Sequence, residues 1–121
     1  MSKLRINLGK RGEAIAADYL RQKGFKILEK NFRNRYGELD IIALDQDTYV
    51  FVEVKTRKGV SFGLPEEAVT ARKQKQVTRA AMGYLSHHDL LDSAVRFDVV
   101  SVLITKIKPQ VSHIVNAFDA A

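Results

Sequence analysis

The sequence predicts an α/β fold, in which a single domain over residues 1–121 has a mixed β-sheet flanked by helices. Runs of β-branched and aliphatic residues at 37–44, 49–57 and 96–104 are typical of strands, and two other segments have the apolar spacing of helices. A chain of 121 residues with 45% hydrophobic residues can form one core but not several enzymatic domains.

The N-terminal third of the chain is predicted to form a helix and a short strand. Apolar residues repeat at helical spacing over 9–23, and Gly24 follows where helices commonly end. Residues 25–29 are predicted to be a strand, and residues 31–36 a basic connector to the next element.

Residues 37–44 and 49–57 are predicted to pair as a β-hairpin, because the four residues between them are turn formers. Pairing Leu44 with Tyr49 sets the register. One face of this hairpin is apolar near the loop and charged at the far end, so the charges are expected at the rim of a buried sheet. The opposite face is fully apolar and is expected to carry Leu39, Ile41, Ala43, Val50, Val52 and Val54.

Four charged side chains share this rim. The predicted register places Asp40 opposite Glu53, and Glu38 opposite Lys55. Two carboxylates at cross-strand distance repel each other, and burial makes the repulsion worse. A divalent cation would relieve both costs, and carboxylate oxygens suit Mg²⁺ or Mn²⁺. Because Lys55 would lie beside such an ion and assist an attacking water, the set suits phosphodiester hydrolysis.

A simpler alternative is a cross-strand salt bridge between Lys55 and either Asp40 or Glu38. This alternative leaves Glu53 unexplained and uses four charges for a task that needs two. We therefore favour the metal site.

Glu13 is the acidic residue of the first predicted helix that falls on its sheet-facing stripe. It shares this stripe with Ala16, Ala17 and Leu20. A carboxylate on a buried stripe needs a partner, and the same metal is one candidate, reached directly or through a water. Alternatively, Glu13 only favours the positive end of the helix dipole, which is worth about 0.3–1 kcal/mol. The residues alone leave both interpretations open.

These acidic residues also carry a resemblance to known nucleases. An acid on the first helix, Asp40 at a strand end and Glu53-x-Lys55 on the next strand resemble the PD-(D/E)XK nuclease superfamily, which includes restriction endonucleases and archaeal Holliday-junction resolvases. From about residue 9 to residue 104, and most specifically in GELD and FVEVKTR, the chain is similar to the YraN-type family of small bacterial proteins.

The resemblance implies a restriction-endonuclease-like fold and a metal-dependent nuclease activity. Leu39 stands where the superfamily's name motif has proline, a departure that many members share. Some members bind nucleic acid without cutting it, so a non-catalytic nucleic-acid-binding module is the alternative function. The implied catalytic residues are Glu13, Asp40, Glu53 and Lys55, of which Asp40, Glu53 and Glu13 would hold Mg²⁺ or Mn²⁺.

The charge balance favours a polyanionic partner. Twenty Lys and Arg residues against fourteen Asp and Glu residues give a formal net charge of +6. Basic residues stand at the expected starts of both helices, where the dipole favours acids, and bound phosphates would explain this choice. For any one residue, a solvated lysine whose stem covers apolar surface is the alternative. The residues predicted to bind DNA are Lys10, Arg11, Arg57, Lys58, Arg72 and Lys73.

The second half of the chain begins with a loop and a helix. Residues 59–65, with two glycines and a proline, are predicted to form a substrate-contacting loop. Thr70 is the predicted N-cap of a helix that ends near His87. Lys73 and Gln76 are expected to be ordinary surface residues of this helix, with a role in the site as the alternative.

Two strands are predicted to complete the sheet. Residues 96–104 should form a core strand in which Asp98 is a strand-end polar group, with a partner of a basic residue as the alternative. Residues 111–118 should form an edge strand, and His113 within it lacks the spacing of a zinc site. Because cutting both strands of a duplex favours a homodimer, this edge is one candidate interface.

Two absences narrow the function classes. With no cysteine, the chain has no disulfide, thiolate metal site or cysteine nucleophile, so a metal site must use oxygen or histidine. No apolar run approaches 18 residues, and the first ten residues lack a signal-peptide core, so a cytoplasmic protein without a membrane span is expected. The predicted function is metal-dependent hydrolysis of DNA, including branched or structured DNA.

Overall fold

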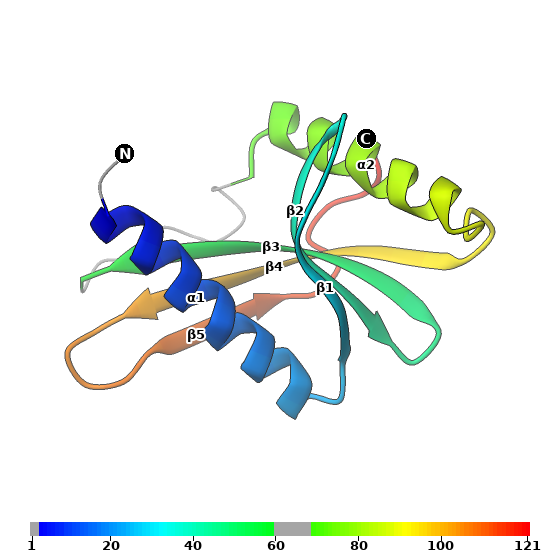
Figure 1. The fold of residues 1–121 in the computed structure, drawn as a ribbon. Coiled ribbons are helices and arrows are strands. Elements are labelled where there is room, and N and C mark those ends of the chain that lie inside the picture. Colours follow the sequence, from blue (N-terminus) through cyan, green and yellow to red (C-terminus); the bar gives the residue numbers. More distant parts are fainter. Residues whose placement is uncertain (1–2, 60–68) are drawn as a thin grey trace.

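Two helices cover the two faces of a five-stranded sheet (Figure 1). The structure is a computed structural model and describes residues 3–59 and 69–121. The elements follow the predicted order of helix, three strands, helix and two strands. They are α1 (Lys3–Gln22), β1 (Lys26–Asn34), β2 (Gly37–Asp45), β3 (Thr48–Lys58), α2 (Ala71–His87), β4 (Ala94–Ile104) and β5 (Gln110–Ile114).

The sheet is mixed, as predicted. Its strand order is β1-β2-β3-β4-β5, with β3 and β4 parallel and the other neighbours antiparallel. Because parallel strands need a crossover connection, α2 runs back across the sheet between β3 and β4. This crossover places α2 on the face opposite α1 (Figure 1).

Both faces of the central strands are buried, which explains their nearly continuous apolar sequences. On one face, Ala16, Ala17 and Leu20 of α1 pack against a cluster from β2, β3 and β4. On the other face, α2 packs against a second cluster. This second cluster contains Leu39, Ile42, Phe51, Val77, Ala80, Ala81, Tyr84, Leu85 and Phe97.

The start of α1 differs from the prediction. The helix begins at Lys3 rather than at residue 9, and Gly9 lies within it. A glycine inside a helix costs about 1 kcal/mol, and packing of Leu8 against the α1-side core helps to offset this cost. Lys10 and Arg11 therefore lie in the middle of α1, so the dipole argument does not apply to them.

Three predictions about the strands are also wrong in detail. The predicted connector 31–36 mostly belongs to β1, because pairing along an edge strand tolerates its polar side chains. The hairpin loop has two residues instead of four, since Asp45 pairs with Thr48 and Gln46 adopts a φ of 54°. β5 ends at Ile114 rather than at residue 118.

The predicted N-cap of α2 is confirmed. The Thr70 side chain accepts a hydrogen bond from the backbone N–H of Lys73 at 3.1 Å. The predicted loop 59–65 lies outside the described residues apart from Gly59. Among the helices of the described ranges, neither is long and apolar enough to cross a membrane.

Candidate functional site

The sheet splits between β2 and β3. Their ladder stops at Ile41 and Val52, whereas β2 stays paired with β1 as far as Gly37 and β3 stays paired with β4 as far as Lys58. Beyond this point the tip of the β1–β2 hairpin bends away from β3 toward α2 (Figure 1). The predicted pairing of Asp40 with Glu53 therefore does not occur as a ladder pair.

Asp40 marks the point of the split. Its Oδ2 atom accepts a hydrogen bond from the backbone N–H of Val54 at 2.8 Å, so its side chain takes the place of a backbone carbonyl of β2. Opposite Asp40, Asn31 of β1 has a left-handed φ of 54°, although β1 continues through this residue. The alternation of faces is broken here, and Leu39 packs on the α2 side instead of sharing the face of Ile41 as predicted.

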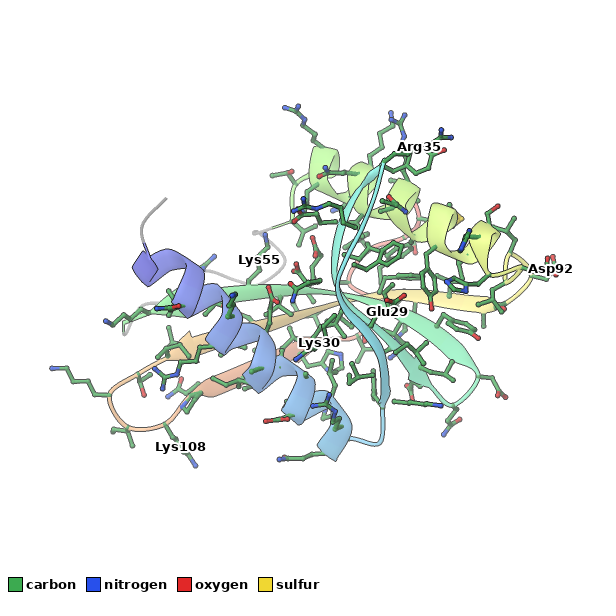
Figure 2. All side chains as sticks on the ribbon, viewed as in Figure 1. Glu29, Lys30, Arg35, Lys55, Asp92 and Lys108 are labelled. Carbon is green, nitrogen blue, oxygen red and sulfur yellow. The ribbon has the colours of Figure 1, made fainter. Side chains whose placement is uncertain are left out.

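Glu38 is not beside Lys55. It forms an ion pair with Arg33 of β1, because it belongs to the part of the hairpin that has left β3. Lys55 forms no ion pair with any residue in the described ranges. Figure 2 shows its side chain rising from β3 on the side of the sheet that carries α2.

Glu53 is a buried acid with an incomplete set of partners. Its exposed fraction is 2%, and its Oε1 atom lies 3.4 Å from Nζ of Lys73 on α2. The Oε2 atom is buried and has no hydrogen-bond partner in the described part of the chain. Leaving a buried polar atom unpaired costs about 1–3 kcal/mol, so this arrangement needs an explanation.

Lys73 thus belongs to the site rather than to the ordinary surface of α2. The sequence signal was its position four residues before Val77, which placed it on the buried stripe of the helix. Its long apolar stem lets the ammonium reach Glu53 while the side chain stays 35% exposed.

The pKa of Glu53 is raised to about 8. Burial is the largest cause, followed by the charge of the nearby Asp40 carboxyl, while Lys73 acts in the opposite direction. Asp40 is therefore close enough to Glu53 to raise the pKa of its carboxyl. The predicted proximity of these two acids is present, although their strands no longer pair.

Glu13 approaches the same region from α1. Gly12 lies so close to β3 that a Cβ atom there would be 1.8 Å from Oγ1 of Thr56, so only glycine permits this helix position. Burial raises the pKa of Glu13, the charge of Asp40 raises it further, and a polar contact with Asn31 lowers it. A cavity of about 370 Å³ lies here, lined by Leu8, Gly9, Glu13, Val54 and Thr56.

Asp40 therefore lies close enough to both Glu13 and Glu53 for its charge to raise the pKa of each. Even so, no three acidic or histidine side chains in residues 3–59 and 69–121 lie close enough together to hold one ion. The Asp40–Glu53 pair itself fits a small hard cation, since it offers carboxylate oxygens and a buried acceptor without a partner. Mg²⁺ needs only one or two protein carboxylates, so direct ligation by Glu13 is not required.

The predicted DNA-binding residues lie on three elements. Lys10 and Arg11 are exposed on α1, Lys58 is exposed at the end of β3 beside the partly buried Arg57, and Arg72 is exposed in the first turn of α2. Contact between Gly12 and Thr56 makes the α1 and β3 groups neighbours.

Asp98 is a second buried acid, and it partners a basic residue instead of being the strand-end polar group that the sequence favoured. Its carboxylate has an exposed fraction of 0% and accepts hydrogen bonds from Arg96 Nε at 2.9 Å and from Asn116 N–H at 2.9 Å. His113 Nε2 lies 2.8 Å from it. Burial alone would raise the pKa of Asp98, but hydrogen bonds with His113, Arg96 and Asn116 outweigh burial and lower it. The only sequence signal was Arg96 two positions away on the same strand face.

Comparison with known proteins identifies the family. Residues 12–102 match the sequence profile of the group described as "Uncharacterised protein family UPF0102". The chain belongs to the UPF0102 family. This result confirms the resemblance to YraN-type proteins, and the matched range contains Glu13, Asp40, Glu53, Lys55 and Lys73.

Relatives in the UPF0102 family are similar over nearly their whole length. The chain is 52% identical over 111 residues to a UPF0102 protein of Syntrophomonas wolfei, covering 92% of this chain and 96% of the relative. It is 49% identical over 115 residues to one of Geobacter metallireducens, covering 95% and 94%. One of Trichlorobacter lovleyi is 49% identical, covering 94% and 91%.

Proposed function

We propose that this UPF0102 protein is a metal-dependent nuclease that hydrolyses phosphodiester bonds of DNA, including branched or structured DNA. The observation that carries the proposal is the buried Glu53, which lies next to Asp40 and keeps an oxygen without a partner where the sheet splits. An ion pair with Lys73 uses only Oε1 of Glu53 and leaves Oε2 free for a ligand. A cation site gives it a ligand.

Each residue of the site has a role in this proposal. Asp40 and Glu53 would hold Mg²⁺ or Mn²⁺, and Glu13 would act from α1 through a water. When bound, the cation would supply Lewis-acid chemistry, polarising the phosphate and activating water. Lys55, free of acidic partners in the described ranges, would steady the attacking water or a phosphate oxygen. Lys73 would balance the charge of Glu53.

Two further features support a nuclease. The order of Glu13, Asp40 and Glu53-x-Lys55 resembles the PD-(D/E)XK superfamily, and an α/β fold with a mixed sheet flanked by helices is consistent with that resemblance. The net charge of +6 favours a polyanionic substrate. The residues proposed to contact DNA phosphates are Lys10, Arg11, Arg57, Lys58, Arg72 and Lys73.

A non-catalytic nucleic-acid-binding module is the second candidate. It is favoured by the absence of a compact group of three metal-binding side chains in residues 3–59 and 69–121. It predicts DNA binding that weakens with salt and survives the loss of Asp40 and Glu53.

Cleavage assays separate the two candidates. Plasmid, linear and four-way-junction DNA are incubated with Mg²⁺ or Mn²⁺ and with wild type, Asp40→Ala or Lys55→Ala. We expect wild type to cut at least one of these substrates and both variants to lose about 10²-fold or more in rate, because each removes a group that acts on the reacting phosphate. Equal cutting by all three proteins would indicate contamination and contradict the proposal, and binding without cutting would favour the module.

A homodimer is part of the proposal. A chain of this size supplies one site, so cutting both strands of a duplex favours two copies. β5 lies at the edge of the sheet, which makes Gln110–Ile114 the proposed interface.

A further inference from the structure

The tip of the β1–β2 hairpin is a surface that the proposed catalytic site does not use. It carries Arg35 and Tyr36, and the Tyr36 side chain is an exposed aromatic with an exposed fraction of 42%. Figure 2 shows Arg35 at the end of this hairpin, beside α2. A cation and an aromatic ring exposed together favour ligands that are both anionic and flat.

This tip is anchored on α2 rather than free in solvent. The Asn34 side chain donates a hydrogen bond to the backbone carbonyl of Ala80 at 3.0 Å and accepts one from the Tyr36 N–H at 2.9 Å. The Tyr36 ring rests on Gly83, where an added Cβ would be 3.1 Å from Cδ2 of the ring. Tyr36 is thus held in place while it remains exposed, which lowers the entropy cost of binding a ligand.

Arg35 is a cation without an acidic partner in the described residues. Arg33 pairs with Glu38, and Lys73 pairs with Glu53. Arg35 instead donates a hydrogen bond to the Tyr36 hydroxyl at 2.6 Å, and its guanidinium lies 4.8 Å from the centre of that ring. Its positive charge is therefore available to an anion.

A pocket of about 320 Å³ lies between the tip and the first turns of α2. This volume falls at the lower end of the range of about 300–1,000 Å³ for ligand pockets, which suits one small ligand rather than a duplex. Its wall includes Lys73, whose ammonium contacts Glu53, so the pocket adjoins the proposed catalytic site. The lining residues are Arg33, Asn34, Arg35, Tyr36, Gly37, Glu38, Lys73 and Gln76.

We infer that this tip pocket binds one unpaired nucleotide of the DNA next to the phosphate held at Asp40 and Glu53. Arg35 contacts the phosphate of that nucleotide, Tyr36 with Arg35 provides the stacking surface for its base, and the Gln76 amide offers hydrogen bonds to the base edge. The inference rests on the proposed function, because it requires DNA as the substrate. It names the substrate class: DNA with a single-stranded segment at a branch, since a paired base stays within its duplex stack.

Binding measurements in EDTA test the inference without cleavage. Fluorescence anisotropy is measured with labelled single-stranded DNA, a duplex, and the same duplex carrying a single-stranded flap. Loss of one stacking contact in Tyr36→Ala should weaken binding of the single strand and the flap about tenfold, and of the duplex less than about twofold. Tyr36→Phe keeps the ring but loses the hydroxyl that accepts the hydrogen bond from Arg35, so it should bind the single strand and the flap more tightly than Tyr36→Ala.

Matched variants separate the tip from general charge effects. Arg35→Ala should weaken binding of the single strand and the flap more than Lys108→Ala, which also removes one positive charge but lies in the turn between β4 and β5, far from the tip (Figure 2). Circular dichroism and thermal unfolding check each variant. If Tyr36→Ala does not fold, the exposed Arg35→Ala carries the test.

The outcomes distinguish this inference from the proposed function. If wild type binds or cuts DNA and Tyr36→Ala matches it, or if Tyr36→Ala weakens duplex and flap equally, the inference is overturned and the nuclease proposal stands. If neither wild type nor Lys108→Ala binds any of the three DNAs, the proposed function fails, and the inference fails with it.

Discussion

Two acids on neighbouring strands, Glu53 on β3 and Asp98 on β4, are equally buried but have opposite surroundings. Their exposed fractions are 2% and 0%. Asp98 is fully partnered by Arg96, His113 and a backbone N–H, whereas Glu53 has one ammonium at 3.4 Å and an oxygen without a partner. Accordingly, the pKa of Asp98 is lowered and that of Glu53 is raised to about 8.

The difference between these surroundings distinguishes a buried acid that stabilises the fold from a buried acid that is available to a ligand. At Asp98, the sheet and its edge supply every partner that a carboxylate needs, so the acid stabilises the region where β4, β5 and the end of α1 meet. At Glu53, a second acid, Asp40, lies nearby at the split of the sheet. The unpartnered oxygen of Glu53 is an acceptor that a ligand can use, and this supports the proposed cation site.

The largest expected effect comes from removing the partnered acid. Asp98→Ala leaves Arg96 and His113 without their shared carboxylate, and breaking a buried ion pair in this way should lower the free energy of unfolding by about 3–5 kcal/mol. Urea unfolding measures the loss. The exposed Asp92→Ala is the control and should change stability by less than about 0.5 kcal/mol. Equal losses for both variants would show that the Asp98 network does not stabilise the fold.

A smaller effect is expected at Glu53, where the charged form of the buried acid lowers the stability of the fold. Because its pKa rises from an ordinary 4.5 to about 8 on folding, the folded protein holds a proton that the unfolded chain releases between these values. The stability from this group is fully present below pH 4.5 and is lost as the pH rises through 8. In EDTA, wild type should lose about 2–4 kcal/mol relative to Glu53→Gln between pH 5 and pH 9.

Unfolding curves at several pH values measure how the free energy of unfolding changes with pH. Asp92→Asn serves as the control and should follow wild type, because it replaces an exposed acid outside the site. If the free energies of unfolding of wild type and Glu53→Gln depend on pH in the same way, the contrast drawn between Glu53 and Asp98 is wrong.

Local patterns were enough to predict the order of the elements and the proximity of Asp40 to Glu53. Alternation over 37–44 and 49–57, with turn formers between them, defines the hairpin whatever surrounds it. Glu13 shares its stripe with buried alanines, so its approach to the sheet also follows from spacing along one helix. Such features depend on residues that are close together in the sequence, so a single sequence is enough to predict them.

Features that depend on distant segments could not be predicted. The split at Asp40 accompanies the anchoring of the hairpin tip on α2, where Asn34 contacts Ala80. The reach of Lys73 to Glu53 depends on where α2 crosses the sheet. The contact between Asp98 and His113 depends on the register of β5 against β4. Each contact joins residues that are separated by at least 15 positions or by a crossover, and no local pattern encodes it.

Calorimetric titration with Mn²⁺ tests the central claim most directly. Metal-free wild type is compared with Asp40→Asn, Glu53→Gln and Lys55→Ala. If Asp40 and Glu53 form a cation site, wild type and Lys55→Ala should each bind about one Mn²⁺ per chain, and the two acid variants should lose that binding. Equal heats for wild type, Asp40→Asn and Glu53→Gln, or no binding by wild type, would contradict the account.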